Sequence, residues 1–401
     1  MTLTRSTVSA TSTAISIIAA ALIALGIVMV FSASASLNAP PLTQHIIKNP
    51  SFRQALFSIA GLVTLLMVGL CPYDSWRMRE HSLKQPALWL LAVVVVLLAA
   101  VLVPGIGEER NGARRWLSLG PGALGLGFQP SELAKLAVVV FVAARCAQLG
   151  DRIQKFWTGL LPMIIVLGII GALVGKEDFG TAALLFGVGF CILIGAGARL
   201  WHIALLSMPA IAGAVALVIA APYRVQRVMS FLDPMADPQG AGYHQIQSLI
   251  TIASGGWWGR GLGAGIQKYG YLPEGRTDFI FAVICEELGV VGGAAIIALF
   301  AILVWQGRKA MLRADTDLGR LIALGATLMI GLQAAMNVAV VTVSVPTKGI
   351  GLPLVSAGGT GVVFFSVLVG LLVNVARARP DTITDFEDAS MTDSHRIGLA
   401  V

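Results

Sequence analysis

The sequence predicts an all-α polytopic membrane protein with about ten transmembrane helices and one long extracytoplasmic loop. Hydrophobic residues make up 56% of the chain and charged residues only 12%, whereas a soluble domain carries roughly 25% charged residues. Uncharged runs of about twenty residues recur along the chain, and each is long enough to cross a hydrocarbon core of roughly 30 Å as a helix. Both observations argue against a soluble fold.

Ten apolar segments are predicted to span the membrane within a single domain, residues 1–379. They are residues 12–34, 54–71, 87–104, 130–149, 156–175, 180–198, 201–221, 278–305, 319–343 and 360–376. An even number of spans places both termini on one side. The basic residues of the short loops are concentrated on that side, which the positive-inside rule assigns to the cytoplasm. The long loop, 222–277, then lies outside.

The two ends of the chain need separate interpretations. Arg5, an apolar stretch and the small residues 32–36 imitate a secretory signal, but the apolar part is longer than a typical signal core, so we expect an uncleaved first span. The tail, residues 380–401, is acidic and poor in apolar residues. We expect it to be a disordered cytoplasmic segment.

Other function classes find little support. The net charge of +7 comes from basic residues in short loops between spans, which favours anionic lipid or an anionic substrate over nucleic acid. The four cysteines are not spaced like a metal or redox motif, and neither a Walker loop nor a dinucleotide fingerprint is present. In the long loop, mostly apolar residues recur at helical spacing between 243 and 253, and two tryptophans follow. This segment can either anchor the loop at the membrane surface or guide a substrate.

Ionisable side chains at the mouths of the spans are few, and most are predicted to lie on the outer side. The group consists of Arg114, Arg115, Glu132, Lys135, Lys176, Asp178, Asp278 and Lys348. Basic residues with one or two carboxylates suit an anionic substrate, such as a diphosphate, whose reaction needs a base. Glu286 and Glu287 are placed deeper, and we expect them to hold helices together or to bind a cation.

The acidic members of this group also have structural interpretations. Glu132 and Lys135 are three residues apart on one helical face and can neutralise each other. Asp178 can cap the sixth helix. Asp278 can be a first-turn acid that the dipole of the eighth helix stabilises. The residues alone leave these alternatives open.

Nine stretches resemble the SEDS family (shape, elongation, division and sporulation), and the resemblance runs from the first predicted span to the last. They are Gly26-Ile-Val-Met-Val-Phe-Ser-Ala-Ser34, Asn111-Gly-Ala-Arg-Arg-Trp116, Gln129-Pro-Ser-Glu-Leu-Ala-Lys135, Asp178-Phe-Gly-Thr181, Gly255-Gly-Trp-Trp-Gly259, Tyr271-Leu-Pro-Glu-Gly-Arg-Thr-Asp-Phe-Ile-Phe281, Glu286-Glu-Leu-Gly289, Pro346-Thr-Lys-Gly349 and Leu352-Pro-Leu-Val-Ser-Ala-Gly-Gly359. The first and eighth resemble the division-associated branch more than the elongation-associated branch.

This resemblance implies a peptidoglycan glycosyltransferase that polymerises lipid II at the outer face of the bacterial inner membrane, at the division septum. The family's catalytic base matches Asp278, which would deprotonate the acceptor's 4-hydroxyl in a single inverting displacement. Cationic side chains, or a divalent cation such as Mg or Mn, would stabilise the leaving diphosphate, and no tightly bound cofactor is expected. The implied substrate-binding residues are Arg114, Arg115, Glu132, Lys135, Asp178, Lys348 and Ser356.

The family also implies partners: a class B penicillin-binding protein and other membrane proteins of cell division. Two departures from its pattern stand close to the site. Gly275 and Arg276 replace alanine and histidine, and we expect the added cation to lower the pKa of Asp278. Ala357 replaces a tyrosine, which we expect to loosen that loop.

Two rival functions are open. A lipid II flippase would have ionisable residues spread through the membrane depth and paired inverted halves, and the sequence shows neither clearly. A scaffold for the penicillin-binding protein would leave the outward charges unexplained.

Overall fold

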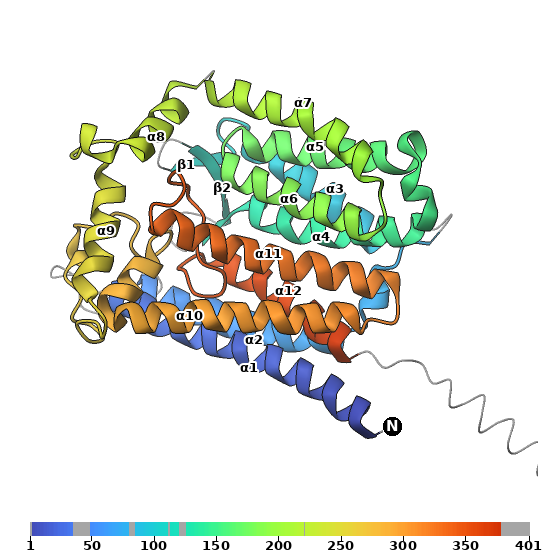
Figure 1. Cartoon of the computed structure of the whole chain (residues 1–401), viewed down its shortest axis with the longest axis horizontal. Helices are drawn as coiled ribbons and strands as arrows, with labels where there is room; N and C mark the ends of the chain where they lie inside the picture. The colour runs from blue at the N-terminus through green and yellow to red at the C-terminus, as the bar shows by residue number, and fades with distance from the viewer. Residues whose placement is uncertain are drawn as a thin grey trace, which may run out of the picture.

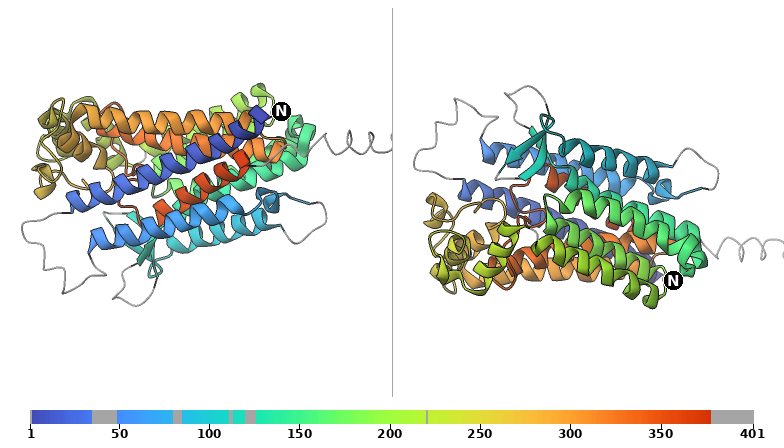
Figure 2. Two further views of the ribbon diagram at one scale, coloured as in Figure 1. Left: turned by 90° about the horizontal axis from the view of Figure 1, so that it is seen from below. Right: turned by 90° about the horizontal axis from the view of Figure 1, so that it is seen from above.

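The protein is a bundle of long, roughly parallel and antiparallel helices, and the long segment 221–279, with its short helices, lies at one end of it (Figure 1). The computed structural model describes residues 2–34, 49–79, 85–110, 113–119, 126–219 and 221–377. The predicted tail, 380–401, lies outside the described residues. Two further views show the long helices sharing one general direction (Figure 2).

Each of the ten predicted spans coincides with a helix in the described part of the chain. These helices are α1 (Thr2–Ala33), α2 (Pro50–Leu70), α3 (Pro86–Val101), α4 (Pro130–Leu149), α5 (Leu161–Gly175), α6 (Phe179–Gly195), α7 (Leu200–Ile219), α10 (Ile280–Leu312), α11 (Asp317–Val341) and α12 (Thr360–Arg377). Seven spans among the described residues are long and apolar enough to cross a membrane, while α3, α6 and α7 provide shorter apolar segments. The polytopic all-α fold is confirmed, and the number of crossings stays a prediction.

Local sequence explains where several helices begin. The Oδ1 atom of Asn49 accepts a hydrogen bond of 2.9 Å from the Ser51 N–H, and Pro50 follows as the first residue of α2. The Thr316 hydroxyl caps α11 in the same way through the Gly319 N–H, at 3.0 Å. These caps satisfy backbone donors that have no partner within the helix.

The central helix of the bundle is α12, which contacts α1, α2, α4, α10 and α11. Its approach to α2 depends on Gly370, because a Cβ there would lie 2.8 Å from Val68 Cβ and 3.0 Å from the Leu65 carbonyl oxygen. Small residues that let helix backbones approach closely are typical of packing in membranes.

The end of the bundle that carries the loops also carries a small sheet. Strands β1 (Gly107–Arg110), β2 (Ala113–Leu119) and β3 (Leu126–Phe128) pair antiparallel in that order. The predicted long loop contains two helices, α8 (Pro222–Leu232) and α9 (Tyr243–Gly255). The helix expected from the pattern at 243–253 is therefore present as α9, whereas the sheet was not anticipated.

Helix α10 is interrupted at Gly289, whose φ of 71° and ψ of −175° lie outside the helical region. The chain after α9 pairs with the broken helix: the Arg260 N–H donates to the Glu286 carbonyl, and the Val290 N–H donates to the Gly256 carbonyl, both at 3.0 Å. A Cβ on Gly259 would lie 2.2 Å from the Glu287 carbonyl oxygen, so only glycine fits this crossing. The crossing anchors the loop that leads to Asp278.

Two fully buried carboxylates reinforce this anchor. Glu287 forms an ion pair with Lys268 at 3.0 Å and accepts a hydrogen bond from the Ser32 hydroxyl of α1 at 2.6 Å. Glu286 accepts a hydrogen bond of 2.8 Å from the Ile266 N–H. Glu287 joins α10 to α1, in line with the expected role of holding helices together, and both carboxylates also tie the loop to α10.

Candidate functional site

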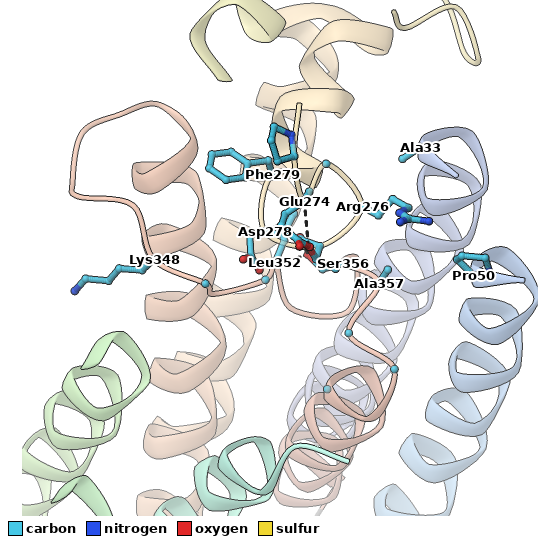
Figure 3. A pocket seen from close by; sticks show the side chains of 18 of the residues that line it. Ala33, Pro50, Glu274, Arg276, Asp278, Phe279, Lys348, Leu352, Ser356 and Ala357 are labelled. Atoms are coloured by element: carbon cyan, nitrogen blue, oxygen red, sulfur yellow. Dashed lines mark hydrogen bonds between the residues drawn. The ribbon is translucent and has the colours of Figure 1, made fainter. Parts of the chain in front are cut away.

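A cavity of about 1890 Å³ opens at the end of the bundle that carries the loops. It lies between the neighbouring ends of α1 and α2, strand β2, the start of α4, the helices α8 and α9, and the segments that precede α10 and α12. Its polar lining includes Arg53, Gln54, Arg115, Glu132, Arg227, His244, Glu274, Arg276, Asp278, Gln333, Lys348 and Ser356. Figure 3 views the part of this cavity around Asp278.

Ser356 joins two of the segments that form the cavity wall. Its hydroxyl donates to the Thr277 carbonyl oxygen at 2.7 Å and accepts a hydrogen bond from the Leu352 N–H at 2.6 Å. The neighbouring Ala357 N–H donates to the Arg276 carbonyl at 3.0 Å. Ser356 therefore holds the loop before α12 against the segment before α10, and its hydroxyl is already occupied by backbone groups.

Asn337 on α11 fixes the backbone of Asp278 from the interior of the bundle. Its Nδ2 atom donates to the Asp278 carbonyl at 2.7 Å and to the Ile350 carbonyl at 2.8 Å. Asn337 is fully buried. The position of Asp278 thus depends on a side chain in the interior of the bundle, which limits its movement relative to the cavity.

Asp278 lies just before α10, which begins at Ile280 with no acidic residue in its first turn. The expectation of a first-turn acid is therefore wrong, because the helix begins later than the apolar run. The side chain of Asp278 instead lines the cavity, where it is partly buried.

The pKa of Asp278 is raised to about 7, mainly by burial and in smaller part by the negative charges of Glu274 and Asp178. The guanidinium groups of Arg115 and Arg227 oppose this rise. Burial prevails because removing a carboxylate from water disfavours its charged form more than the two cations stabilise it. A carboxyl group with a pKa near neutrality suits a general base at neutral pH.

The predicted effect of Arg276 on this group is wrong. We expected Arg276 to lower the pKa of Asp278, whereas that pKa is raised and Arg276 is not among the charges that act on it. Figure 3 shows the reason: the Arg276 side chain points away from Asp278, toward the neighbouring ends of α1 and α2 at Ala33 and Pro50. Arg276 and Asp278 are only two residues apart in the sequence, but the segment is irregular and their side chains point in different directions.

Arg115 on β2 is held by the turn between α5 and α6. Its Nη1 atom lies 3.5 Å from Asp178 Oδ2, and its Nη2 atom donates to the Glu177 carbonyl. Asp178 also accepts hydrogen bonds from the Thr181 N–H at 3.0 Å and hydroxyl at 2.9 Å, which confirms that it caps α6. Asp178 thus positions Arg115 and lies behind it, outside the cavity lining.

Lys348 is the second cation beside Arg115. Its Nζ atom lies 5.6 Å from the centre of the Phe179 ring. Burial lowers the pKa of Lys348, and the charge of Asp178 partly offsets that effect. In Figure 3, Lys348 and Arg276 lie on opposite sides of Asp278.

Two residues that were predicted to bind the substrate instead form ion pairs within the protein. Lys135 Nζ forms an ion pair of 2.6 Å with Glu132 Oε1, as the structural interpretation proposed, and it is buried outside the cavity lining. Arg114 makes an ion pair of 3.4 Å with Glu109, because successive residues of a strand, here Arg114 and Arg115, face opposite sides. Glu132 itself lines the cavity.

Several lining residues were missed by sequence reasoning. His244 on α9 stacks on Phe279, with ring centres 5.9 Å apart, and burial and Arg227 lower its pKa. Arg227 on α8 and Arg53 on α2 also line the cavity and are absent from the predicted site. Their cavity positions depend on how α2, α8 and α9 fold over the bundle, which residue spacing does not reveal.

A divalent metal site would need several converging oxygen or nitrogen ligands. No group of three or more His, Cys, Asp or Glu side chains converges in this part of the chain. Asp178 is occupied by its helix cap and by Arg115, so the protein side chains around Asp278 do not supply a ready-made ligand set. We derive no step through a metal ion.

Comparison with known proteins gives consistent matches. Residues 12–380 match the sequence profile of the FtsW, RodA and SpoVE family, described as cell cycle proteins. Stage V sporulation protein E of Bacillus subtilis (strain 168) is 37% identical over 365 residues, covering 90% of this chain and 95% of that protein. The probable peptidoglycan glycosyltransferase FtsW of Nitrosococcus halophilus (strain Nc4) is 41% identical over 365 residues, covering 89% and 90%.

Two solved structures share the fold. One chain of a peptidoglycan synthase complex, described in terms of the coordination of polymerization and crosslinking, matches with a TM-score of 0.69 and 27% identity, covering 92% of this chain and 98% of that chain. RodA of Thermus thermophilus matches with a TM-score of 0.61 and 25% identity, covering 92% and 97%.

Proposed function

Because the chain belongs to the FtsW, RodA and SpoVE family of cell cycle proteins, and resembles the FtsW members, we propose that it is a peptidoglycan glycosyltransferase that joins lipid II units into glycan strands. The observation that carries this proposal is Asp278, a carboxyl group with a pKa of about 7 in a cavity otherwise rich in cations. This combination supports a reaction that removes a proton and releases an anion.

The reaction is a single displacement at the anomeric carbon of the donor sugar. Asp278 takes the proton of the acceptor's 4-hydroxyl while that oxygen forms the new bond to the anomeric carbon. The bond between this carbon and the diphosphate oxygen breaks on the opposite face, so an α-linked donor gives a β linkage. The lipid-linked diphosphate departs with the electron pair, and Asp278 later releases its proton to water.

Arg115 and Lys348 stabilise the charge that develops on the leaving diphosphate. Arg115 is oriented by Asp178 and the Glu177 carbonyl before substrate binds, so little reorganisation is required during the reaction. Lys348, with its lowered pKa and partial burial, provides a second donor in a poorly solvated place. Diphosphate as a leaving group supplies the driving force without a nucleotide.

The multi-pass membrane fold suits a substrate with a polyprenyl tail. We place the protein in the bacterial inner membrane at the division septum, with both termini in the cytoplasm and the cavity outside. The similarity to a chain of a peptidoglycan synthase complex supports a partnership with a class B penicillin-binding protein. We also propose that the chain crosses the membrane ten times and that residues 1–379 form a single domain.

The test is polymerisation of lipid II by the purified protein in proteoliposomes, with and without a class B penicillin-binding protein. We expect glycan strands, resolved by gel electrophoresis, that require this chain. Transfer of lipid II across the vesicle membrane without any polymer would favour a flippase instead. A chain that only stimulates crosslinking by its partner, again without making polymer, would be a scaffold.

A further inference from the structure

Six cationic side chains of the described residues line the cavity, and besides Arg227 and Lys268, which forms an ion pair with Glu287, they make two pairs on different sides of Asp278 (Figure 3). Arg115 and Lys348 are next to α6, where Lys348 contacts Phe179. Arg276 lies on the other side and points toward the neighbouring ends of α1 and α2, where Ala33 and Pro50 are labelled (Figure 3). Arg53 is on α2, near that beginning, and lines the same cavity.

Arg53 and Arg276 differ from the first pair in their surroundings. Arg115 has Asp178 beside it, whereas the described residues contain no carboxylate within ion-pair distance of Arg53 or Arg276. Arg276 is exposed to the cavity and Arg53 is partly buried. The N-terminus of α2 adds a partial positive charge to the same region.

Hydrogen bonds fix the backbone of Arg276, although no carboxylate among the described residues pairs with its side chain. The Ala357 N–H donates to the Arg276 carbonyl, and Ser356 bonds to the next residue, Thr277. The guanidinium group is thus presented from a rigid segment, as in a binding site that is formed before its ligand arrives. Arginine donors in a planar fork suit phosphate oxygens in particular.

Polymerisation brings two lipid-linked diphosphates to the enzyme, and only one of them leaves. The acceptor keeps its diphosphate, and its own sugars separate that group from the hydroxyl that Asp278 deprotonates. The retained diphosphate therefore needs an anion site apart from the leaving-group site.

We propose that Arg53 and Arg276 form this second site and bind the diphosphate that the acceptor retains. The inference rests on the proposed function, which supplies the second diphosphate. It assigns a role to Arg276, a residue at which the chain departs from the family pattern. An anionic phospholipid headgroup shares the same phosphate chemistry, so the test must separate the two sources.

The first test measures binding without turnover. Asp278→Asn protein in phosphatidylcholine nanodiscs is titrated with farnesyl diphosphate by calorimetry. We expect two sites, one site when Arg53→Gln and Arg276→Gln are added, and two sites with the control Arg260→Gln. Arg260 is exposed at the same end of the bundle and lies outside the cavity lining. An unchanged number of sites in the double variant would overturn the proposal.

A second arm repeats the titration with phosphatidylglycerol in the nanodiscs. We expect two sites to remain at similar affinity. Loss of the arginine-dependent site would identify it as a phospholipid site and overturn the assignment. This binding readout holds even if the wild-type protein makes no polymer, so failure of the proposed function and failure of the second site can be told apart.

The third test is kinetic. In Arg53→Gln and Arg276→Gln, the lipid II concentration for half-maximal rate should rise about tenfold, with the maximal rate within about twofold of wild type, because a charged hydrogen bond to the bound acceptor is lost. Arg53→Lys and Arg276→Lys should recover only part of the affinity, because lysine keeps the charge but not the planar fork of donors. A fall in maximal rate at unchanged half-saturation would contradict a site for the retained diphosphate.

Discussion

Asp278 and Arg115 approach the same backbone position, Gly349, from two sides. A Cβ at Gly349 would lie 3.3 Å from Asp278 Oδ2 and 3.3 Å from Arg115 Nη1. The proposed base and the proposed leaving-group cation therefore both lie beside Gly349, a residue without a side chain. A sugar whose hydroxyl reaches Asp278 would bring its reaction partner near Arg115.

This geometry predicts that Gly349→Ala impairs the reaction more than the fold. The methyl group would displace Asp278 or Arg115 by a few tenths of an ångström, and we expect a loss of about tenfold in polymerisation rate, since small misplacements of reacting groups are costly. Gly187→Ala is the control, because a Cβ there meets no atom within 4 Å. Equal rates for both variants would show that the spacing at Gly349 does not matter.

The pKa of Asp278 predicts the pH dependence of polymerisation. The base must be ionised, so the rate should rise with pH through about 7. Glu274→Gln removes a charge that raises this pKa and should move the midpoint to lower pH. Arg227→Gln removes a charge that lowers it and should move the midpoint to higher pH. Profiles of kcat/KM check both shifts, and coincident profiles for all three proteins would refute them.

The leaving-group assignment predicts large rate losses without unfolding. Arg115→Ala and Lys348→Ala should each lose roughly 2 to 4 kcal/mol of transition-state stabilisation, by analogy with removal of one preorganised donor. Thermal unfolding should distinguish them, because Arg115 also contacts Asp178 whereas Lys348 makes no ion pair in the described part of the chain. Wild-type rates in both variants would leave the cations a topological or lipid-binding role.

The orientation is tested by thiol labelling. In a chain without Cys71, Cys146, Cys191 and Cys285, a cysteine at Gln239 should react with a membrane-impermeant reagent in intact cells, after permeabilisation of any outer membrane. A cysteine at Thr316 should be protected. Gln239 is exposed at the end of the bundle near the cavity, and Thr316 begins α11 at the other end. The reverse labelling pattern would invert the proposed topology.

Sequence reasoning located the helices better than the contacts between them. Apolar runs predict spans because every backbone polar group in lipid must be satisfied within a helix. Asp178, Arg115 and Lys348 were identified as charges near one membrane face, and they do come together. The positions of His244 and Arg276 in the cavity depend on how the loop crosses the broken helix at Gly289, a tertiary arrangement without a local sequence signal.

The small sheet was missed for a similar reason. Strand β2 pairs with both β1 and β3, yet it alternates too briefly to be distinguished from a polar loop. The strand affects the site directly. Successive side chains of β2 face opposite sides, so Arg115 faces the cavity and Arg114 faces Glu109. Adjacent arginines that looked equivalent therefore have different surroundings.

The central claim is that Asp278 acts as the general base, and Asp278→Asn tests it most directly. Asparagine preserves the size of the side chain, and the Asn337 bond to the backbone carbonyl is unaffected. An amide does not accept a proton near neutral pH, so a rate loss of about 10² to 10⁴ is expected. The purified variant should insert, bind lipid II with near-normal affinity and form essentially no glycan. Polymerisation by Asp278→Asn near the wild-type rate would contradict the mechanism.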